Sequence, residues 1–533
     1  MDRSTVSGDE APSASVVEKS MAPAERSGTV LTRRYIIFAF WVIIGCLGLP
    51  LWLWTTSIHR ASLPLESMNR WAEGKACQVH YPLNVEVYAK DMSSGAAASL
   101  AKQTQDLLAG ASQSDLYSFR VTAGVASGII SRSKDSHLRI NLATSKGFRT
   151  QSKLMAWDSV LDVDAGAEHA KNSESMAAFV AGQITNVFDP EYASTTRLLS
   201  KSAFRNDKKK SLEPKVKATL DARTTRAFKY ASNYHLTFSL FSATSSPASW
   251  DIEKAIDRYM SPLIIRLSAI SNITVDTQVQ LHAALSSSIA GPTFDPTTGQ
   301  WRLNKADLSG FINAAEWPLN PSIGSGPTIN FVLYVPGASQ SPLVIAETGG
   351  NSWLVPQWGS VQILNSQLIS LSAQDLEPVM LTFANQLTSL LGLPEQPASL
   401  ALRISSLARE RATSLILSAS STLGALSRLT LKLTSIAIPE SVATSVANTI
   451  SHLEQACNGL REGRFDDALA HARIANDEAE RAFFEPSMVG QVYFPDEHKV
   501  AVYVPLLGPM AVPLVMAAAK EVRKLRGGKV KTV

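Results

Sequence analysis

Two uncharged apolar stretches, one near each end of the chain, dominate the pattern of hydrophobic positions. They cover Tyr35 to Trp54 and Val500 to Ala519. An α-helix rises about 1.5 Å per residue, so about 20 apolar residues cross a hydrocarbon core of about 30 Å. The pattern therefore predicts transmembrane helices over residues 35–56 and 499–519.

Basic residues flank both stretches on their outer sides. Arg33 and Arg34 precede the first, and a tail over residues 520–533 with six basic residues follows the second. By the positive-inside rule both termini face the cytosol, and the region between the stretches lies across the membrane. A cleaved signal peptide is the alternative for the first stretch, but its apolar core would span only about 7 to 15 residues. Because Trp52 and Trp54 also suit a membrane interface, a retained anchor is the favoured interpretation.

Three prolines recur every four residues in the second stretch, at Pro505, Pro509 and Pro513. Each removes a backbone donor and clashes with the carbonyl four residues earlier. Neighbouring helices or trapped water can satisfy such carbonyls within a membrane. We therefore predict a bent helix that packs against other membrane helices, with a lone bent anchor in lipid as the alternative.

Residues 57–395 alternate between strand and helix patterns, which predicts a mixed α/β domain, and residues 396–495 show helical spacing throughout. With a disordered arm over residues 1–34, the predicted fold class is α+β. Two transmembrane helices flank a large luminal domain with a helical C-terminal portion. Predicted strands cover 83–88, 235–241, 273–281, 329–335, 343–346 and 361–364, and predicted helices cover 97–108, 251–266, 379–391, 415–433, 442–460 and 465–483.

The net charge of +4 comes mostly from the C-terminal tail. Residues 55–499 hold 39 basic and 40 acidic side chains, so the luminal region is nearly neutral. Nucleic acid is therefore not an expected partner, because its binding requires a concentrated basic surface.

Two cysteines, Cys77 and Cys457, lie outside the apolar stretches. A luminal compartment would permit a disulfide between them, although sequence alone cannot place them within bonding distance. Free buried thiols are the alternative. Asn272 begins an Asn-x-Thr sequon at the head of a predicted strand, so a glycan there would require an edge or a turn.

The C-terminal end carries lysines at the fifth and third positions from the last residue, Lys529 and Lys531. This spacing resembles a dilysine retrieval signal, which coat proteins read on the cytosolic tails of endoplasmic-reticulum membrane proteins. A basic flank that ends in lysines by chance is the alternative.

Motifs that carry catalysis or bind cofactors are missing from the sequence: there is no Walker loop, HExxH, GxSxG, dinucleotide fingerprint or paired CxxC. Cys77 and His80 stand three positions apart in an extended segment, so their side chains point to opposite faces and do not pair as nucleophile and base. The histidines are scattered singly. We therefore predict no catalytic, metal or cofactor site.

Several short segments occur in a characteristic order along the chain. They are WTT at 54–56, RASLP at 60–64, FINAAE at 311–316, NFVLYVP at 330–336, SPL at 341–343, QWG at 357–359, ERAFFEPS at 480–487, YFPD at 493–496 and YVPL at 503–506. In this combination the chain resembles the PIG-S family, which are subunits of the glycosylphosphatidylinositol (GPI) transamidase. The likeness covers both apolar stretches and the C-terminal half, and it is weak over about residues 90–250.

The resemblance implies a place in an endoplasmic-reticulum membrane complex that cleaves a C-terminal signal from a precursor protein and attaches a GPI lipid. In that family the catalytic cysteine and histidine belong to a different, caspase-like subunit. The chain is therefore expected to be a non-catalytic subunit that binds the other subunits and meets the lipid and the precursor through the complex. The alternatives are a membrane-tethered luminal hydrolase with dispersed catalytic residues and a general two-span scaffold.

Overall fold

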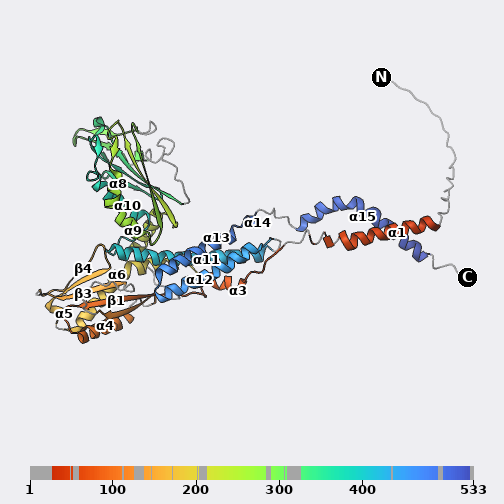
Figure 1. Ribbon diagram of the computed structural model, residues 1–533, viewed down its shortest axis with the longest axis horizontal. Helices are drawn as coiled ribbons and strands as arrows, with labels where there is room; N and C mark the ends of the chain where they lie inside the picture. The colour runs from red at the N-terminus through yellow and green to blue at the C-terminus, as the bar shows by residue number, and fades with distance from the viewer. Residues whose placement is uncertain are drawn as a thin grey trace, which may run out of the picture. The chain divides into compact units, whose positions relative to one another are not determined.

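The chain folds into two compact units in the computed structural model (Figure 1). The terminal unit comprises Met1–Arg60, Ser435–Ala437 and Ser487–Val533, and the main body comprises Ala61–Thr434 and Ile438–Pro486. The structure describes residues 27–48, 50–51, 54, 59–110, 113, 115–124, 137–145, 147–170, 172–200, 202, 213–283, 290–304, 306–308, 326–433, 436–489 and 496–527.

The terminal unit brings together one helix from each end of the sequence. Helix α1 (Ser27–Ile43) continues into a π-helical turn, η1 (Ile44–Gly48), and α15 (Asp496–Gly527) contains the second apolar stretch with its three prolines. Within the described ranges, only Gly28–Gly48 has the length and composition to cross a membrane. A membrane crossing by α15 stays a prediction.

Helix α1 begins at Ser27, inside the arm that we predicted to be disordered, rather than at Tyr35. Once a helix has nucleated, each added residue gains one backbone hydrogen bond, so the polar residues before the apolar stretch extend the same helix. The Thr32 hydroxyl donates to the Gly28 carbonyl oxygen at 2.9 Å within this extension. The apolar pattern therefore located the membrane-compatible segment but not the start of the helix.

The first sheet of the main body has five strands in the order β2-β1-β3-β5-β4. Neighbouring strands are parallel except β4, which is antiparallel to β5. Helix α4 (Ser94–Ala109) packs on β1 and β2 and against α6 (Ser173–Ser200), with the short α5 (Ala167–Ala170) before it. The predicted strand 83–88 and helix 97–108 are confirmed. The strands are β1 (Tyr81–Ala89), β2 (Tyr117–Ala123), β3 (Leu138–Thr144), β4 (Gln151–Leu154) and β5 (Val160–Ala165).

The second sheet also has five strands, in the order β13-β14-β11-β6-β8, and only β13 is antiparallel to its neighbour. Its strands coincide with the predicted strands at 235–241, 273–281, 329–335 and 361–364, which are confirmed. The strands are β6 (Asn233–Ser242), β8 (Asn272–Gln280), β11 (Thr328–Val335), β13 (Ser352–Val355) and β14 (Gly359–Ile363).

The helices of the second sheet also follow the sequence pattern. The helix predicted over 251–266 is interrupted by a π-helical turn, η2 (Ile256–Met260), between α8 (Ile252–Ala255) and α9 (Ser261–Leu267). Helix α10 (Glu377–Leu390) packs on β14 and is followed by Gly392 with a φ of 76°. Glycine suits this left-handed position at a helix end because it has no Cβ.

The two sheets share one topology, although we predicted a single α/β domain over residues 57–395. When the strands of each sheet are numbered from one to five in chain order, both sheets read 2-1-3-5-4. In each, a helical segment joins the first two strands and the antiparallel edge strand is the fourth. The sequence carries no visible repeat, because many side chains satisfy the same strand and helix patterns.

The two sheets differ in what covers their second face. Along β1, buried and partly exposed residues alternate, whereas β11 and β14 are buried almost throughout. A small sheet, β12-β10-β9, supplies part of an apolar cluster with the second sheet. Its strands are β9 (Thr293–Asp295), β10 (Gln300–Leu303) and β12 (Leu343–Ile345), and the cluster includes Phe241, Leu303, Val332, Tyr334, Leu343, Ile345, Val361 and Ile363.

Three helices form the helical region: α11 (Leu400–Lys432), α12 (Glu440–Glu462) and α13 (Phe465–Phe483). They lie alongside one another, and α3 (Leu65–Ala72) packs on α11 (Figure 1). The predicted helices from 415 to 483 are confirmed. The region is not a separate unit, however, because α11 and α12 also contact α6 and β1. The remaining short elements are α7 (Pro214–Arg226), β7 (Ser249–Trp250), η4 (Ala338–Gln340), β15 (Ser370–Leu371) and α14 (Pro486–Val489).

Candidate functional site

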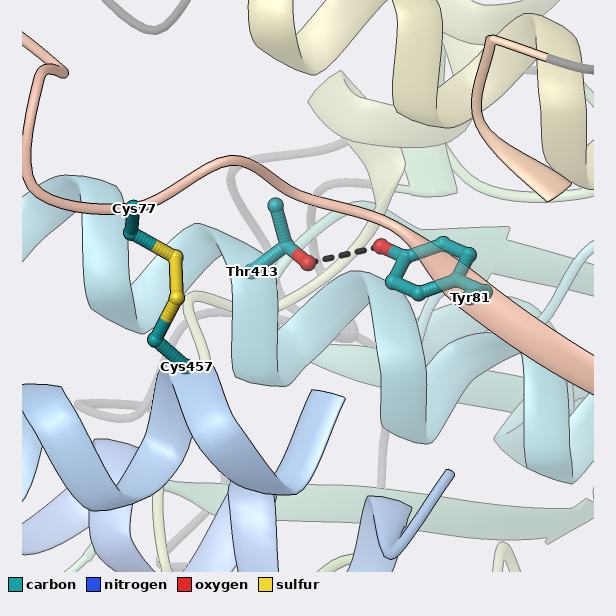
Figure 2. The surroundings of a disulfide bond; sticks show 4 residues. All are labelled: Cys77, Tyr81, Thr413 and Cys457. Carbon is teal, nitrogen blue, oxygen red and sulfur yellow. Dashed lines mark hydrogen bonds between the residues drawn. A yellow bond between two sulfur atoms is a disulfide. The ribbon is translucent and has the colours of Figure 1, made fainter. Parts of the chain in front are cut away.

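A disulfide bond between Cys77 and Cys457 ties the segment before β1 to helix α12 (Figure 2). The two Cα atoms are 6.0 Å apart across 380 residues of sequence, and both cysteines are buried. A crosslink of this span restricts the unfolded chain, which typically adds about 2–4 kcal/mol of stability. Cys77 is therefore not a free thiolate that could act with His80.

Close to this bond, polar side chains connect the first sheet to α11. The Tyr81 and Thr413 hydroxyl oxygens are 2.7 Å apart (Figure 2). On the same helix, Arg409 makes a two-point ion pair with Glu191 of α6, with both N···O distances at 2.6 Å. The two side chains are only 1% and 4% exposed. A buried pair of this kind costs desolvation, so it is expected to fix how α6 and α11 fit together more than to add stability.

Burial also sets the protonation of the groups around this pair. It raises the pKa of the Tyr81 and Tyr117 hydroxyls above their ordinary value, so both stay neutral. Burial, together with nearby Arg409, lowers the pKa of His137 to about 4. A neutral ring is consistent with the hydrogen bond that it makes: His137 Nδ1 accepts from the backbone N–H of Asn84 at 3.0 Å.

Sequence reasoning missed the buried ion pair. A signal was available: Arg409 stands seven residues after Leu402 and seven before Ile416, both buried residues of α11. A charge that repeats on the apolar stripe of a helix indicates a buried partner. The partner, Glu191, lies in a different helix that the sequence could not place.

The terminal helices are joined at a charged contact. Glu521 of α15 accepts hydrogen bonds from Arg33 at 2.8 Å and from Arg34 at 2.9 Å. The contact joins the start of the first apolar helix to the end of the second, so α1 and α15 are antiparallel there. On α15, all three predicted packing prolines, Pro505, Pro509 and Pro513, have exposed side chains.

Asn272, the predicted glycosylation site, is exposed at the first position of β8. Strand β8 is an edge strand that pairs only with β6 in this sheet. The sequon threonine, Thr274, contacts His235 Nδ1 on β6. The position therefore meets the steric requirement for a glycan, and its occupancy stays a prediction.

The described residues hold no cluster of metal-binding side chains. Within the described ranges, no group of three or more His, Cys, Asp or Glu side chains is placed to hold a metal ion. The predicted retrieval lysines, Lys529 and Lys531, lie outside the described residues, as do residues 311–316 and 493–495.

Two of the characteristic segments meet in the second sheet. The backbone N–H of Asn330 donates to the Trp358 carbonyl oxygen at 3.0 Å, and Asn330 pairs with Gly359 across β11 and β14. A Cβ on Gly359 would lie 1.9 Å from the Asn330 carbonyl oxygen, so only glycine fits. These residues pack strands together rather than perform chemistry.

Comparison with known proteins identifies the family. The sequence profile of the phosphatidylinositol-glycan biosynthesis class S proteins matches residues 39–528. The chain belongs to the PIG-S family. The match extends from the first apolar helix to the end of α15, so it includes both units of this family member.

Individual relatives agree with this PIG-S assignment. The chain is 33% identical over 336 residues to the GPI-anchor transamidase component PIGS of Rattus norvegicus, which covers 58% of this chain and 60% of the relative. It is 28% identical to the GPI transamidase component PIG-S homolog of Schizosaccharomyces pombe, covering 92% and 84% respectively. The GPI transamidase component GPI17 of Saccharomyces cerevisiae is 27% identical, with 90% of each chain covered. The chain thus spans about three fifths of the matched mammalian relative and most of each yeast relative.

Proposed function

We propose that this chain is a non-catalytic component of a GPI transamidase, the complex that attaches GPI anchors to precursor proteins in the endoplasmic reticulum. The observation that carries the proposal is the family match over residues 39–528, together with relatives named as transamidase components. The chain would act by binding the caspase-like catalytic subunit and the remaining membrane subunits, and the lipid and precursor would be met through the complex.

Several features of the main body favour a binding role over catalysis. Cys77 is consumed in a disulfide, and the strongest polar contact, between Arg409 and Glu191, is closed off from solvent. A nucleophile needs an exposed or cavity-facing position with a base beside it. The disulfide also fits an oxidising lumen as the location of the main body.

The proposed topology has two membrane crossings, with both termini in the cytosol and the main body in the lumen. The contact of Arg33 and Arg34 with Glu521 supports it, because it places the outer ends of both helices together. Protease added outside sealed microsomes should trim only the termini and spare the main body. Glycosidase treatment should increase the electrophoretic mobility of the protein, and Asn272→Gln should remove that shift. Digestion of the main body in sealed vesicles would refute the topology.

The prolines of α15 are the proposed contact with partner helices. The carbonyls that they leave without donors require neighbours that lipid does not provide, and their exposed side chains leave this part of the helix open to partner helices. Replacing Pro505, Pro509 and Pro513 together with leucine should weaken co-purification of the other subunits in mild detergent. Replacing the exposed Val512, Val515 and Met516 of the same helix with leucine is the matched control. Assembly that survives the proline changes intact would contradict this contact.

Affinity purification of the full chain, followed by mass spectrometry, tests the function as a whole. We expect a fixed set of transamidase subunits and no hydrolytic turnover by the chain alone. Turnover by the purified single chain would favour the tethered hydrolase. Recovery of unrelated receptors or transporters in place of the transamidase would favour a general scaffold.

A further inference from the structure

A cavity of about 660 Å³ lies in the main body. Helices α6, α7, α11 and α13 and the segment 227–232 before β6 contribute its lining. Its volume lies within the range of about 300–1,000 Å³ that is typical of small-molecule sites. Two residues of the characteristic segments, Gln357 and Glu480, line it.

The lining carries an excess of basic side chains, of which Arg197 and Arg223 are ion-paired with Asp221 and Glu410. Five basic side chains and three acidic side chains line the cavity. Arg411 donates to the Leu391 carbonyl oxygen at 3.1 Å, and Arg473 donates to the carbonyl oxygen of Ile270. Within the described residues neither arginine makes an ion pair, and the buried Nε of Arg473 has no hydrogen-bond partner. Two guanidinium groups without an ion pair on one cavity favour an anionic ligand.

Tyr230 holds the two arginines on a common aromatic surface. Its ring centroid lies 5.8 Å from the guanidinium carbon of Arg411 and 5.7 Å from that of Arg473. Burial raises the pKa of Tyr230, and its hydroxyl donates to Ile270, so the ring is neutral and fixed. The arginines are therefore positioned before any ligand arrives, which reduces the entropy lost on binding.

The cavity also contains a buried acceptor without a donor. Glu410 is 7% exposed, and its Oε2 is paired with Arg223. Its Oε1 has no hydrogen-bond partner. A buried oxygen without a donor is costly, so a ligand that supplies a hydroxyl or amino hydrogen would be favoured. Ser414, Ser418 and Asn476 add further neutral hydrogen-bonding groups to the lining.

A glycine helps to keep the cavity open beside Arg411. A Cβ on Gly392 would lie 3.3 Å from an Arg411 terminal nitrogen and 3.0 Å from the Ala227 Cβ. Gly392 is also left-handed, with a φ of 76°, so any other residue would strain the turn as well as crowd the arginine. The turn after α10 is therefore part of the site.

We propose that this cavity binds a phosphorylated saccharide, with its phosphate at Arg411 and Arg473 and its hydroxyl groups at Glu410 and the neighbouring serines. A ligand that is anionic and also carries hydroxyl donors satisfies both halves of the lining. The recognition chemistry stands on the cavity itself. The identification of the biological ligand as the phosphate-bearing glycan of a GPI lipid rests on the proposed function.

Titration calorimetry on the detergent-solubilised full chain tests the proposal, with mannose 6-phosphate, mannose and inorganic phosphate as probes. We expect mannose 6-phosphate to bind more tightly than either fragment. Arg411→Gln and Arg473→Gln should each weaken it about ten- to hundredfold, because each removes a charge-assisted contact. Arg428→Gln, which neutralises an exposed arginine of the same helix outside the cavity, should leave binding unchanged.

Three results would overturn the proposal: no binding of mannose 6-phosphate, equal binding of mannose 6-phosphate and mannose, or equal affinities in the wild-type chain and both glutamine variants. Thermal unfolding of each variant checks its fold. If Arg411→Gln unfolds the chain, Arg473→Gln and the charge-conserving Arg411→Lys carry the test. Arg411→Lys should retain part of the affinity.

Two further experiments identify the source of the ligand and distinguish a failure of this proposal from a failure of the proposed function. A phosphatidylinositol-linked glycan in nanodiscs should compete with mannose 6-phosphate, and nanodiscs with phosphatidylinositol alone should not. A failure to compete would assign the cavity to a free phosphosugar and overturn the lipid-linked source. Co-purification of transamidase subunits should be the same for Arg411→Gln and wild type. Lost subunits with normal sugar binding would refute the proposed function and leave the cavity assignment standing.

Discussion

The two five-stranded sheets share one strand order but differ in the groups that cover their second face. The second sheet covers both faces with apolar groups, since β11, β14 and the small sheet join in one cluster. The first sheet leaves polar residues such as Asn84 and Glu86 partly exposed. It is tied to the helical region by the Cys77–Cys457 bond and the Arg409–Glu191 pair.

This difference teaches that one topology can be stabilised by two kinds of interaction. Apolar burial contributes about 25 cal/mol per Å² and is spread over many residues, so it tolerates small changes. A buried ion pair and a crosslink are concentrated in a few atoms. The loss of either partner therefore lowers the free energy of unfolding directly. The second sheet should therefore resist point changes at its polar contacts, and the first sheet should depend on a few named residues.

The largest expected effect compares the third strands of the two sheets. Val332 on β11 is fully buried in the apolar cluster, whereas Asn141 on β3 is exposed. Val332→Asn should lower the free energy of unfolding by about 5 kcal/mol, because it removes apolar contact and buries an unpaired amide. Asn141→Val should change it by less than about 0.5 kcal/mol. Urea unfolding of the full chain in detergent measures both, and similar effects at the two sites would show that both faces are covered.

The next effect concerns the buried ion pair. Arg409→Met leaves Glu191 charged and buried, and should cost about 4 kcal/mol. The double variant Arg409→Met with Glu191→Leu should recover most of this loss, because no charge is then left without a partner. Limited proteolysis should show faster cleavage near the first sheet for the single variant and unchanged fragments from the second sheet. A double variant as unstable as the single one would mean that the pair itself supplies net stability.

Removal of the disulfide should have a somewhat smaller effect. Cys77→Ser with Cys457→Ser should lower the free energy of unfolding by about 3 kcal/mol, since the unfolded chain regains the conformational freedom of the long loop. Cys46→Ser is the control, because Cys46 is a free cysteine. Reduction of the wild-type chain with dithiothreitol should reproduce the effect of the double variant. An unchanged melting temperature after full reduction would contradict the assigned role.

The smallest expected effect is a pH dependence at the first sheet. The pKa of His137 is about 4 in the folded chain against an ordinary 6.5, so the unfolded state takes up a proton first as the pH falls. Stability from this group is constant above about pH 7 and declines between pH 6.5 and 4. By pH 5 the loss should reach about 2 kcal/mol. His137→Gln should flatten this part of the stability profile, and an identical slope in the variant would exclude the histidine as its source.

Much of the fold was visible in the sequence because it depends on local periodicity. Alternating apolar residues located β1 and β6, and the helical stripe before Gly392 located α10 and its end. The shared topology of the two sheets was not visible, because strand order depends on which strands pair across long loops. The candidate ligand cavity was invisible for the same reason, since Arg411 and Arg473 come from different helices.

The sequence by itself determined two apolar segments of membrane-spanning length, the types of most elements, and membership of a family recognisable from packing residues such as Asn330 and Gly359. These properties are carried by neighbouring residues along the chain. Tertiary structure alone decided that Cys77 meets Cys457, that Arg409 meets Glu191, and that Glu410 faces a cavity with an oxygen lacking a donor. Such pairings join residues far apart in sequence, and only the packing of helices against sheets brings them within reach.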